Sequence, residues 1–149
     1  MNISLQNFLP HQAPMLMVDT VLEISDTHVV TEFLVKENCI FLDENFLAES
    51  GLIENMAQTC SAIVGQFYFT NENSDKRILG YISAIKKLDI YALPKVLNKV
   101  HTEAHQLSRF DLDGYSSICS MRCEAFWGET ILASAEMNLF IKELTDEKK

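Results

Sequence analysis

The spacing of hydrophobic and polar positions changes near residue 50 and again near residue 70. Between them the sequence reads SGLIENMAQTCSAIVGQFYF, in which apolar side chains recur at helical spacing over a wide arc. Glu54 is the only charged residue of this segment, whereas a helix on a protein surface normally carries several charges. The pattern therefore predicts a long helix over 50–69 that is enclosed on nearly all sides, with Ser50 as its N-cap.

The rest of the chain is typical of β-strands. Alternating or continuous apolar stretches bounded by turn residues predict two strands before the helix and four after it, at 15–24, 29–35, 78–90, 97–108, 114–127 and 130–142. The polar segment 70–76 is predicted to be a surface loop. One helix among runs of strands favours an α+β fold, in which a curved antiparallel sheet wraps around the helix. We expect residues 1–149 to form this single domain.

Charge and hydropathy narrow the classes of function. The N-terminus has no basic and apolar leader, and no apolar run is long enough to span a membrane, so a cytoplasmic protein without a membrane partner is expected. The net charge of −9 argues against nucleic-acid binding. Residues 75–101 depart from this balance, with six basic and two acidic side chains. Such a basic stretch can steer an acidic partner to the protein.

Three short motifs connect the sequence to a known family. Residues 9–19 (LPHQAPMLMVD), 54–58 (ENMAQ) and 133–137 (ASAEM) resemble the opening segment, the start of the central helix and the last strand of hot-dog-fold 3-hydroxyacyl-[acyl-carrier-protein] dehydratases. The order and spacing also match over nearly the whole chain. The resemblance implies a hot-dog fold and dehydration of 3-hydroxyacyl thioesters on an acyl carrier protein, in fatty-acid or polyene-type synthesis.

The segment before the helix departs from that family. Ordinary members carry a Gly-His-Phe-Pro-Gly motif there, and its His is the catalytic partner of the helix Glu. Residues 41–51 of this chain read FLDENFLAESG and contain no His, and Asn45 takes the position of that His. In this respect the chain resembles a divergent branch, the dehydratase-like proteins of pigment and aryl-polyene pathways.

Dehydration requires a base, an acid and a donor to the thioester oxygen. A lone carboxylate on an apolar helix suits proton exchange, and His11 is the remaining His that lies within a family-like motif. We therefore predict Glu54 and His11 as the catalytic pair. Gly51 is expected to let a thioester approach the free N–H groups of the helix start. Further substrate-binding positions are predicted at Asn45, Ile53, Met56 and Gln58.

Neither a cofactor nor a metal ion is expected. His101 and His105 lie four apart on one strand face, but the pattern supplies no carboxylate or cysteine to complete a metal site. Small hot-dog units pair their edge strands, so we expect a homodimer, an assembly of dimers, or a heteromer with a paralogue.

Two other functions remain open at this point. A hot-dog thioesterase would use a carboxylate near the helix start, and Asp43, Glu44 and Glu49 are available. A non-catalytic subunit would bind an acyl carrier or a partner chain. Acyl chain length and the choice between carrier protein and coenzyme A do not follow from the sequence.

Overall fold

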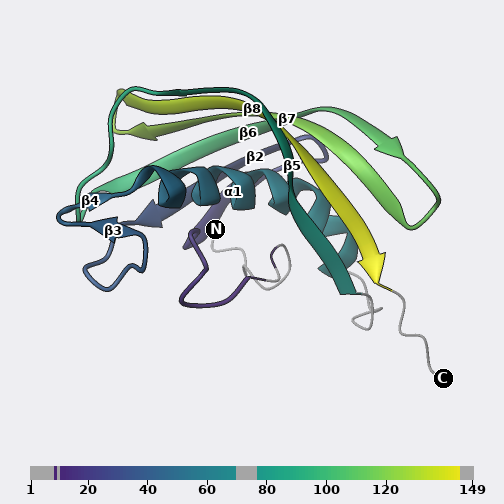
Figure 1. The fold of residues 1–149 in the computed structure, drawn as a ribbon, viewed down its shortest axis with the longest axis horizontal. Helices are drawn as coiled ribbons and strands as arrows, with labels where there is room; N and C mark the ends of the chain where they lie inside the picture. Colours follow the sequence, from purple (N-terminus) through teal and green to yellow (C-terminus); the bar gives the residue numbers. More distant parts are fainter. Residues whose placement is uncertain (1–8, 10, 70–76, 145–149) are drawn as a thin grey trace.

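One curved sheet and one long helix make up the fold of the computed structural model, which describes residues 9, 11–69 and 77–144 (Figure 1). The helix, α1, spans Glu49–Phe69. The six strands of the sheet are β1 (Thr20–Ile24), β2 (His28–Leu34), β5 (Arg77–Ile90), β6 (Lys99–Asp111), β7 (Ser116–Trp127) and β8 (Thr130–Leu144). A short hairpin of β3 (Leu42–Asp43) and β4 (Phe46–Leu47) precedes the helix.

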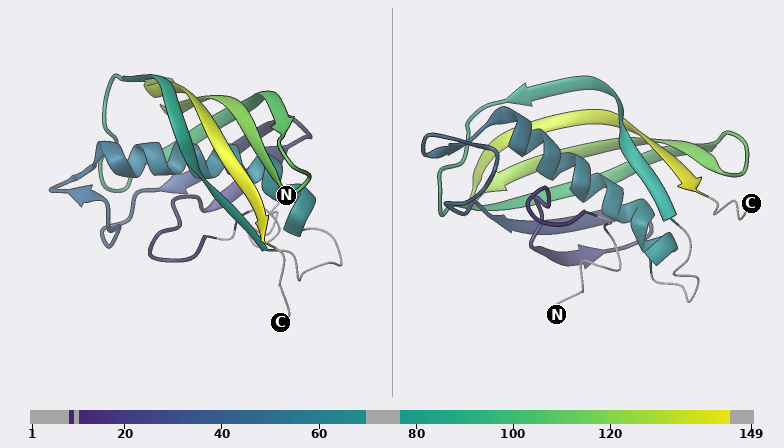
Figure 2. Two further views of the ribbon diagram at one scale, coloured as in Figure 1. Left: turned by 45° about the vertical axis from the view of Figure 1, so that its right-hand side comes forward. Right: turned by 60° about the horizontal axis from the view of Figure 1, so that its bottom comes forward.

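The sheet is antiparallel throughout, in the order β1-β2-β6-β7-β8-β5. Its concave face curves over α1, as both views of Figure 2 show. The hairpins β6–β7 and β7–β8 turn at Gly114 and Gly128, both with positive φ, which glycine adopts without a steric penalty. This is the hot-dog architecture that the sequence predicts, with β1 and β5 at the two edges of the sheet.

The enclosure of the helix follows from its side chains. Leu52, Met56 and Ile63 are fully buried against the concave face, where Val100, Met121 and other apolar side chains complete the core. Apolar burial of this kind stabilises the fold by about 25 cal/mol per Å² removed from water. The sheet no longer covers the helix near its last turn. Phe67 is exposed there, although the apolar pattern places it on the same side of the helix as the buried residues.

The structure corrects several predicted boundaries. The first strand begins at Thr20 rather than at residue 15. The backbone groups of Met15 and Met17 bond side chains of α1 instead of a neighbouring strand. The β3–β4 hairpin was not predicted. Ser50 is not the N-cap: α1 begins at Glu49, and the carbonyl of Ala48 accepts the N–H of Leu52.

The predicted surface loop at 70–76 lies outside the described residues. Within the part of the chain that the structure describes, α1 is the one helix, and it does not combine the length and the apolar character that crossing a membrane requires.

Candidate active site

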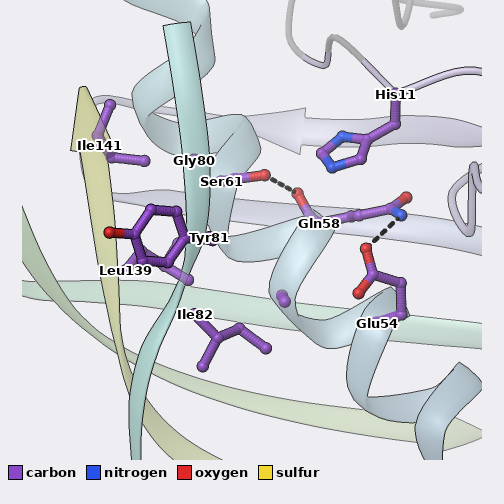
Figure 3. Close-up of a pocket in the computed structure, with 10 residues that line it drawn as sticks. His11, Glu54, Gln58, Ser61, Gly80, Tyr81, Ile82, Leu139 and Ile141 are labelled. Carbon is purple, nitrogen blue, oxygen red and sulfur yellow. Dashed lines mark hydrogen bonds between the residues drawn. The ribbon is translucent and has the colours of Figure 1, made fainter. Parts of the chain in front are cut away.

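A cavity of about 190 Å³ lies between the outward side of α1 and the edge of the sheet formed by β5 and β8. Figure 3 shows the residues around it, with polar groups gathered on the helix side and apolar groups on the strands. The cavity is lined by His11, Glu54, Ala57, Gln58, Ser61, Gly80, Tyr81, Ile82, Leu139 and Ile141. The two predicted catalytic residues thus share one cavity, although they are far apart in sequence.

Glu54 and Gln58 lie one turn apart on α1, so their side chains are neighbours. The amide Nε2 of Gln58 donates a hydrogen bond of 2.9 Å to Oε1 of Glu54 (Figure 3). The carboxylate of Glu54 is half-buried, and one of its oxygens is held by this bond. The helix therefore presents an oriented carboxylate to the cavity.

Gln58 also binds the segment that leads into β1. Its Oε1 accepts the N–H of Met17 at 2.7 Å, and its Nε2 donates to the carbonyl of Met15 at 2.9 Å. Asn55 adds a third bond, from Nδ2 to the carbonyl of Met17 at 2.7 Å, while its Oδ1 accepts the hydroxyl of Thr102 at 2.6 Å. Buried amides that satisfy backbone groups in this way fix the path of an otherwise irregular segment.

This segment carries His11 to the cavity. The N–H groups of Met15 and Leu16 both bond the carbonyl of Gln12, which makes a tight turn between His11 and the anchored backbone. In Figure 3 the imidazole of His11 enters from the side opposite to Glu54, with the Gln58 amide between them. Helix polar groups therefore position the histidine as well as the carboxylate.

The imidazole of His11 is partly enclosed. Burial lowers its pKa below the ordinary value of 6.5, and the negative charge of Glu54 opposes this effect. Its Nδ1 is buried and has no hydrogen-bond partner among the described residues. An imidazole with an unused nitrogen and a lowered pKa is neutral at pH 7, which is the form that accepts a proton.

The other predicted substrate-binding residues lie away from this cavity, with Gln58 as the exception. Asn45 is exposed in the β3–β4 turn, and Met56 is buried in the core. Ile53 is half-buried and is not part of the lining.

Gly51 packs against the hairpin before the helix, and its expected role toward the thioester stays a prediction. It is buried, and a Cβ atom there would stand 2.6 Å from Cδ1 of Leu47 and 2.6 Å from Cβ of Phe41. Packing against the hairpin before the helix accounts for the glycine, because no larger residue fits. That side of the helix start is occupied by Leu47 and Phe41.

The remaining titratable candidates are distant from the cavity. Asp43, Glu44 and Glu49 are exposed, and none belongs to its lining. His28, His101 and His105 lie on β2 and β6, which are separated from β5 by β7 and β8.

The basic residues of the stretch 75–101 lie in two separate parts of the sheet. Lys86 and Lys87 lie on β5, whereas Lys99 of β6 pairs with Glu32 of β2 at 3.1 Å. Lys76 lies outside the described residues.

Sequence reasoning missed the anchoring role of Asn55 and the contribution of Ser61, Tyr81 and the β8 side chains to the cavity. A signal for the first was present, since Asn55 and Gln58 are amides on an otherwise apolar helix and a buried amide must find partners. No comparable signal marked Tyr81, because the cavity wall on β5 depends on how the sheet curves.

Solved structures with the same fold include several hot-dog proteins. The dehydratase heterocomplex ApeI:P from Xenorhabdus doucetiae matches with a TM-score of 0.80 at 20% identity, over 98% of this chain and 94% of that one. The sigma28-regulated virulence protein Cj0977 from Campylobacter jejuni matches with a TM-score of 0.65 at 16% identity, over 97% and 98%. A hypothetical thioesterase protein with coenzyme A from Streptococcus pneumoniae matches with a TM-score of 0.56 at 11% identity, over 82% and 84%.

At these identities the structural matches establish the fold alone. No curated protein sequence is significantly similar to the chain. A family model described as ApeP dehydratase matches residues 3–148, which is nearly the full length. The chain therefore belongs to the ApeP-like dehydratase family.

Proposed function

We propose that this protein dehydrates 3-hydroxyacyl thioesters carried on an acyl carrier protein, with Glu54 and His11 as the catalytic pair. One observation carries the proposal: these two groups, from α1 and from the segment before β1, line the same cavity. A carboxylate and an imidazole on opposite sides of one cavity are the two proton-exchanging groups that an elimination needs.

In this proposal each group has one role, and the neutral form of His11 supports the first of them. Neutral His11 takes the proton from the carbon next to the thioester carbonyl. Glu54, which must be protonated for this role, gives a proton to the hydroxyl at the next carbon, and the carbon–oxygen bond breaks to release water. The double bond forms from the electrons of the broken C–H bond. Transfer of a proton from His11 back to Glu54 restores both groups, so that the net change is the loss of one water.

The acyl chain has an apolar wall to follow. Ile82, Leu139 and Ile141 project from β5 and β8 across from the helix (Figure 3). The volume of about 190 Å³ is nevertheless below the roughly 300 Å³ at which small-molecule sites begin. A second chain that extended the cavity would make room for the substrate.

The donor to the thioester oxygen also points to a second chain. Among the polar groups of this cavity, the Gln58 amide is engaged with Glu54, Met15 and Met17, and the hydroxyl of Ser61 donates to the carbonyl of Gln58 at 2.9 Å. The hydroxyl of Tyr81, on β5, points away from the helix in Figure 3. A backbone or side-chain donor from a partner would supply the missing charge stabilisation.

We infer that this partner pairs with β5. This edge strand carries Leu79, Tyr81 and Ile85 as exposed apolar residues, and edge strands of this kind are stabilised by pairing with another strand. Because Gly80, Tyr81 and Ile82 of β5 also line the cavity, a partner on this edge lies beside it. A homodimer and a heteromer with a paralogue both fit, and the ApeI:P structure is a heterocomplex.

The thioesterase alternative has less support. Its candidate carboxylates, Asp43, Glu44 and Glu49, are exposed at the β3–β4 hairpin and the helix start, away from the cavity. A non-catalytic subunit remains the alternative that the assay must separate from the enzyme.

The test is to incubate the protein with a 3-hydroxyacyl carrier-protein thioester and to follow the mass of the loaded carrier. We expect the loss of one water from the acyl group, and a decrease in rate of about a hundredfold or more in Glu54→Gln and in His11→Ala. Glu49→Gln and His101→Ala, which change exposed groups elsewhere, serve as controls at wild-type rate. Loss of the whole acyl group would mean a thioesterase. A folded protein that binds the carrier and leaves its mass unchanged would overturn the catalytic proposal.

A further inference from the structure

A second group of convergent side chains lies on the opposite face of the sheet. In β2 the residues Val29, Thr31 and Phe33 are buried against the helix, so His28 projects to the outer face. In β6 the buried residues Thr102 and Ala104 likewise leave Glu103 and His105 on the outer face. The sheet itself separates this cluster from α1 and from the catalytic cavity.

The donor atoms of His28, Glu103 and His105 point at one another. Oε1 of Glu103 lies 2.8 Å from Nε2 of His28 and 3.2 Å from Nε2 of His105. The two imidazole rings lie side by side with their centroids 4.6 Å apart, and one ligand atom from each of the three residues falls within 4.8 Å of the others. Tetrahedral Zn²⁺ with bonds of about 2.0–2.1 Å holds its ligand atoms about 3.3 Å apart. Small side-chain rotations are enough to reach that spacing.

The backbone holds the cluster in register. His28 and His105 are directly opposite each other in the antiparallel β2–β6 pair, and Glu103 is two residues along on the same face. The turn before β2 is tied down as well, because the N–H of Ser25 bonds the carbonyl of His28 at 2.7 Å and the N–H of Gln106 bonds the carbonyl of Thr27 at 2.8 Å. Donors on neighbouring strands of one sheet therefore converge before any ion arrives.

Access and charge are compatible with a cation. The side chains of His28, Glu103 and His105 are 27%, 46% and 39% exposed, so an ion from solvent can enter. On β7, Glu124 lies opposite Glu103, and Arg122 lies opposite both His105 and the β8 residue Glu136. The nearest exposed cation on β7 thus has a carboxylate neighbour of its own.

We propose that His28, Glu103 and His105 form a binding site for a divalent transition-metal ion of the zinc type. Two imidazole nitrogens and one carboxylate oxygen are a ligand set that zinc accepts, with the fourth position left to water. The ion would link β2 to β6 on the outer face, apart from the thioester chemistry. The sequence alone suggested His101 with His105 as the only histidine pair and found no carboxylate for it. The fold instead joins His105 to Glu103 and to His28 across the strand pair.

The proposal is tested by titrating the full-length protein with Co²⁺, whose visible absorption reports tetrahedral coordination, and then displacing it with Zn²⁺. We expect saturation at one ion per chain and a rise in thermal midpoint with Zn²⁺. His28→Ala, Glu103→Gln and His105→Ala should each weaken the affinity about tenfold or more, because each removes one of three ligands.

Two control variants separate this site from the other histidines and from the catalytic cavity. His101 lies on the same strand and face, and His101→Ala should bind Co²⁺ as the wild type does. Glu54→Gln should also bind Co²⁺ normally, because the catalytic cavity is not involved. Circular dichroism of each variant checks that it is folded. The absence of saturable binding, or equal affinity in the wild type and His28→Ala, would overturn the proposal, as would a loss of binding in Glu54→Gln.

Discussion

The side-chain amide of Gln58 donates a hydrogen bond of 2.9 Å to the carboxylate of Glu54, one helical turn before it. The same amide bonds the backbone of Met15 and Met17, in the segment that leads from His11 into β1. One buried residue therefore orients the proposed acid and anchors the chain that delivers the proposed base. Its removal is expected to affect both stability and catalysis.

Gln58→Met keeps the volume of the side chain but leaves the buried N–H of Met17 and the partly buried carbonyl of Met15 without their partner. Each unsatisfied buried group costs about 1–3 kcal/mol, so the free energy of unfolding should fall by roughly 3 kcal/mol in urea denaturation. The control is Gln66→Met on the same helix, whose amide bonds the carbonyl of Ser25 in a more exposed setting. It should lose less than about 1 kcal/mol. Equal losses in the two variants would contradict the anchoring role.

The central elements of the fold could be predicted because each has a strong local signal. A twenty-residue apolar stretch with Glu54 as its lone charge indicates an enclosed helix, and hydrophobic alternation locates the strands after it. The segment from Met15 to Asp19 was predicted as strand for the same reason, since it is apolar. The backbone of Met15 and Met17 pairs with helix amides, and pairing with β2 begins only at Asp19, whose N–H bonds the carbonyl of Glu32. Hydrophobic pattern alone does not distinguish these partners.

The candidate site was predictable only in part. His11 and Glu54 lie in motifs of a known family, and the resemblance brought them together before any geometry was known. Gly51 was predicted to let a thioester approach the free N–H groups of the helix start, because the sequence shows the missing side chain but not what packs against it. The contact that requires a glycine comes from a hairpin that the pattern did not predict. The outer-face cluster needs the register of His28 against His105, which depends on the pairing of two strands distant in sequence.

The titration of His11 gives a direct measure of its environment. Burial lowers its pKa and the Glu54 charge raises it, with burial the larger cause, so NMR of the imidazole should show a pKa below 6.5. In Glu54→Gln the opposing charge is gone, and the pKa of His11 should fall further. A pKa of His11 that rises in Glu54→Gln would contradict the shared cavity.

The same shift makes stability depend on pH with a defined sign. Well above pH 6.5, His11 is neutral in both the folded and the unfolded chain and contributes nothing to the pH dependence. As the pH falls below that value, the unfolded chain binds the proton first, so the free energy of unfolding decreases until the pH passes the lowered pKa of the folded state. His11→Ala should flatten this part of the stability profile, measured by urea denaturation at a series of pH values. An unchanged slope in the variant would assign the effect to another group.

Gly51→Ala tests whether packing explains the glycine. The added Cβ would stand 2.6 Å from atoms of Phe41 and Leu47, and the first of these, a Cβ, is fixed to the backbone. Overpacking of this kind costs about 1–3 kcal/mol, which exceeds the gain of up to about 1 kcal/mol from replacing glycine in a helix. Thermal denaturation should therefore show a clear loss. Gly80→Ala, where a Cβ meets only the end of the Ile141 side chain at 3.1 Å, should be nearly neutral.

Lys86 and Lys87 provide the test of the carrier protein as partner. Both lie on β5, whose residues Gly80, Tyr81 and Ile82 line the cavity, so an acidic carrier that docks on them has its thioester arm beside the site. Reversing both lysines to Glu should slow the reaction of a carrier-bound substrate more than that of a small thioester. The double reversal of Lys95 and Lys99 makes the same change of charge away from β5 and should slow neither substrate selectively. Equal slowing of both substrates by the β5 variant would exclude docking through these lysines, because a loss that ignores the carrier must arise in the cavity itself.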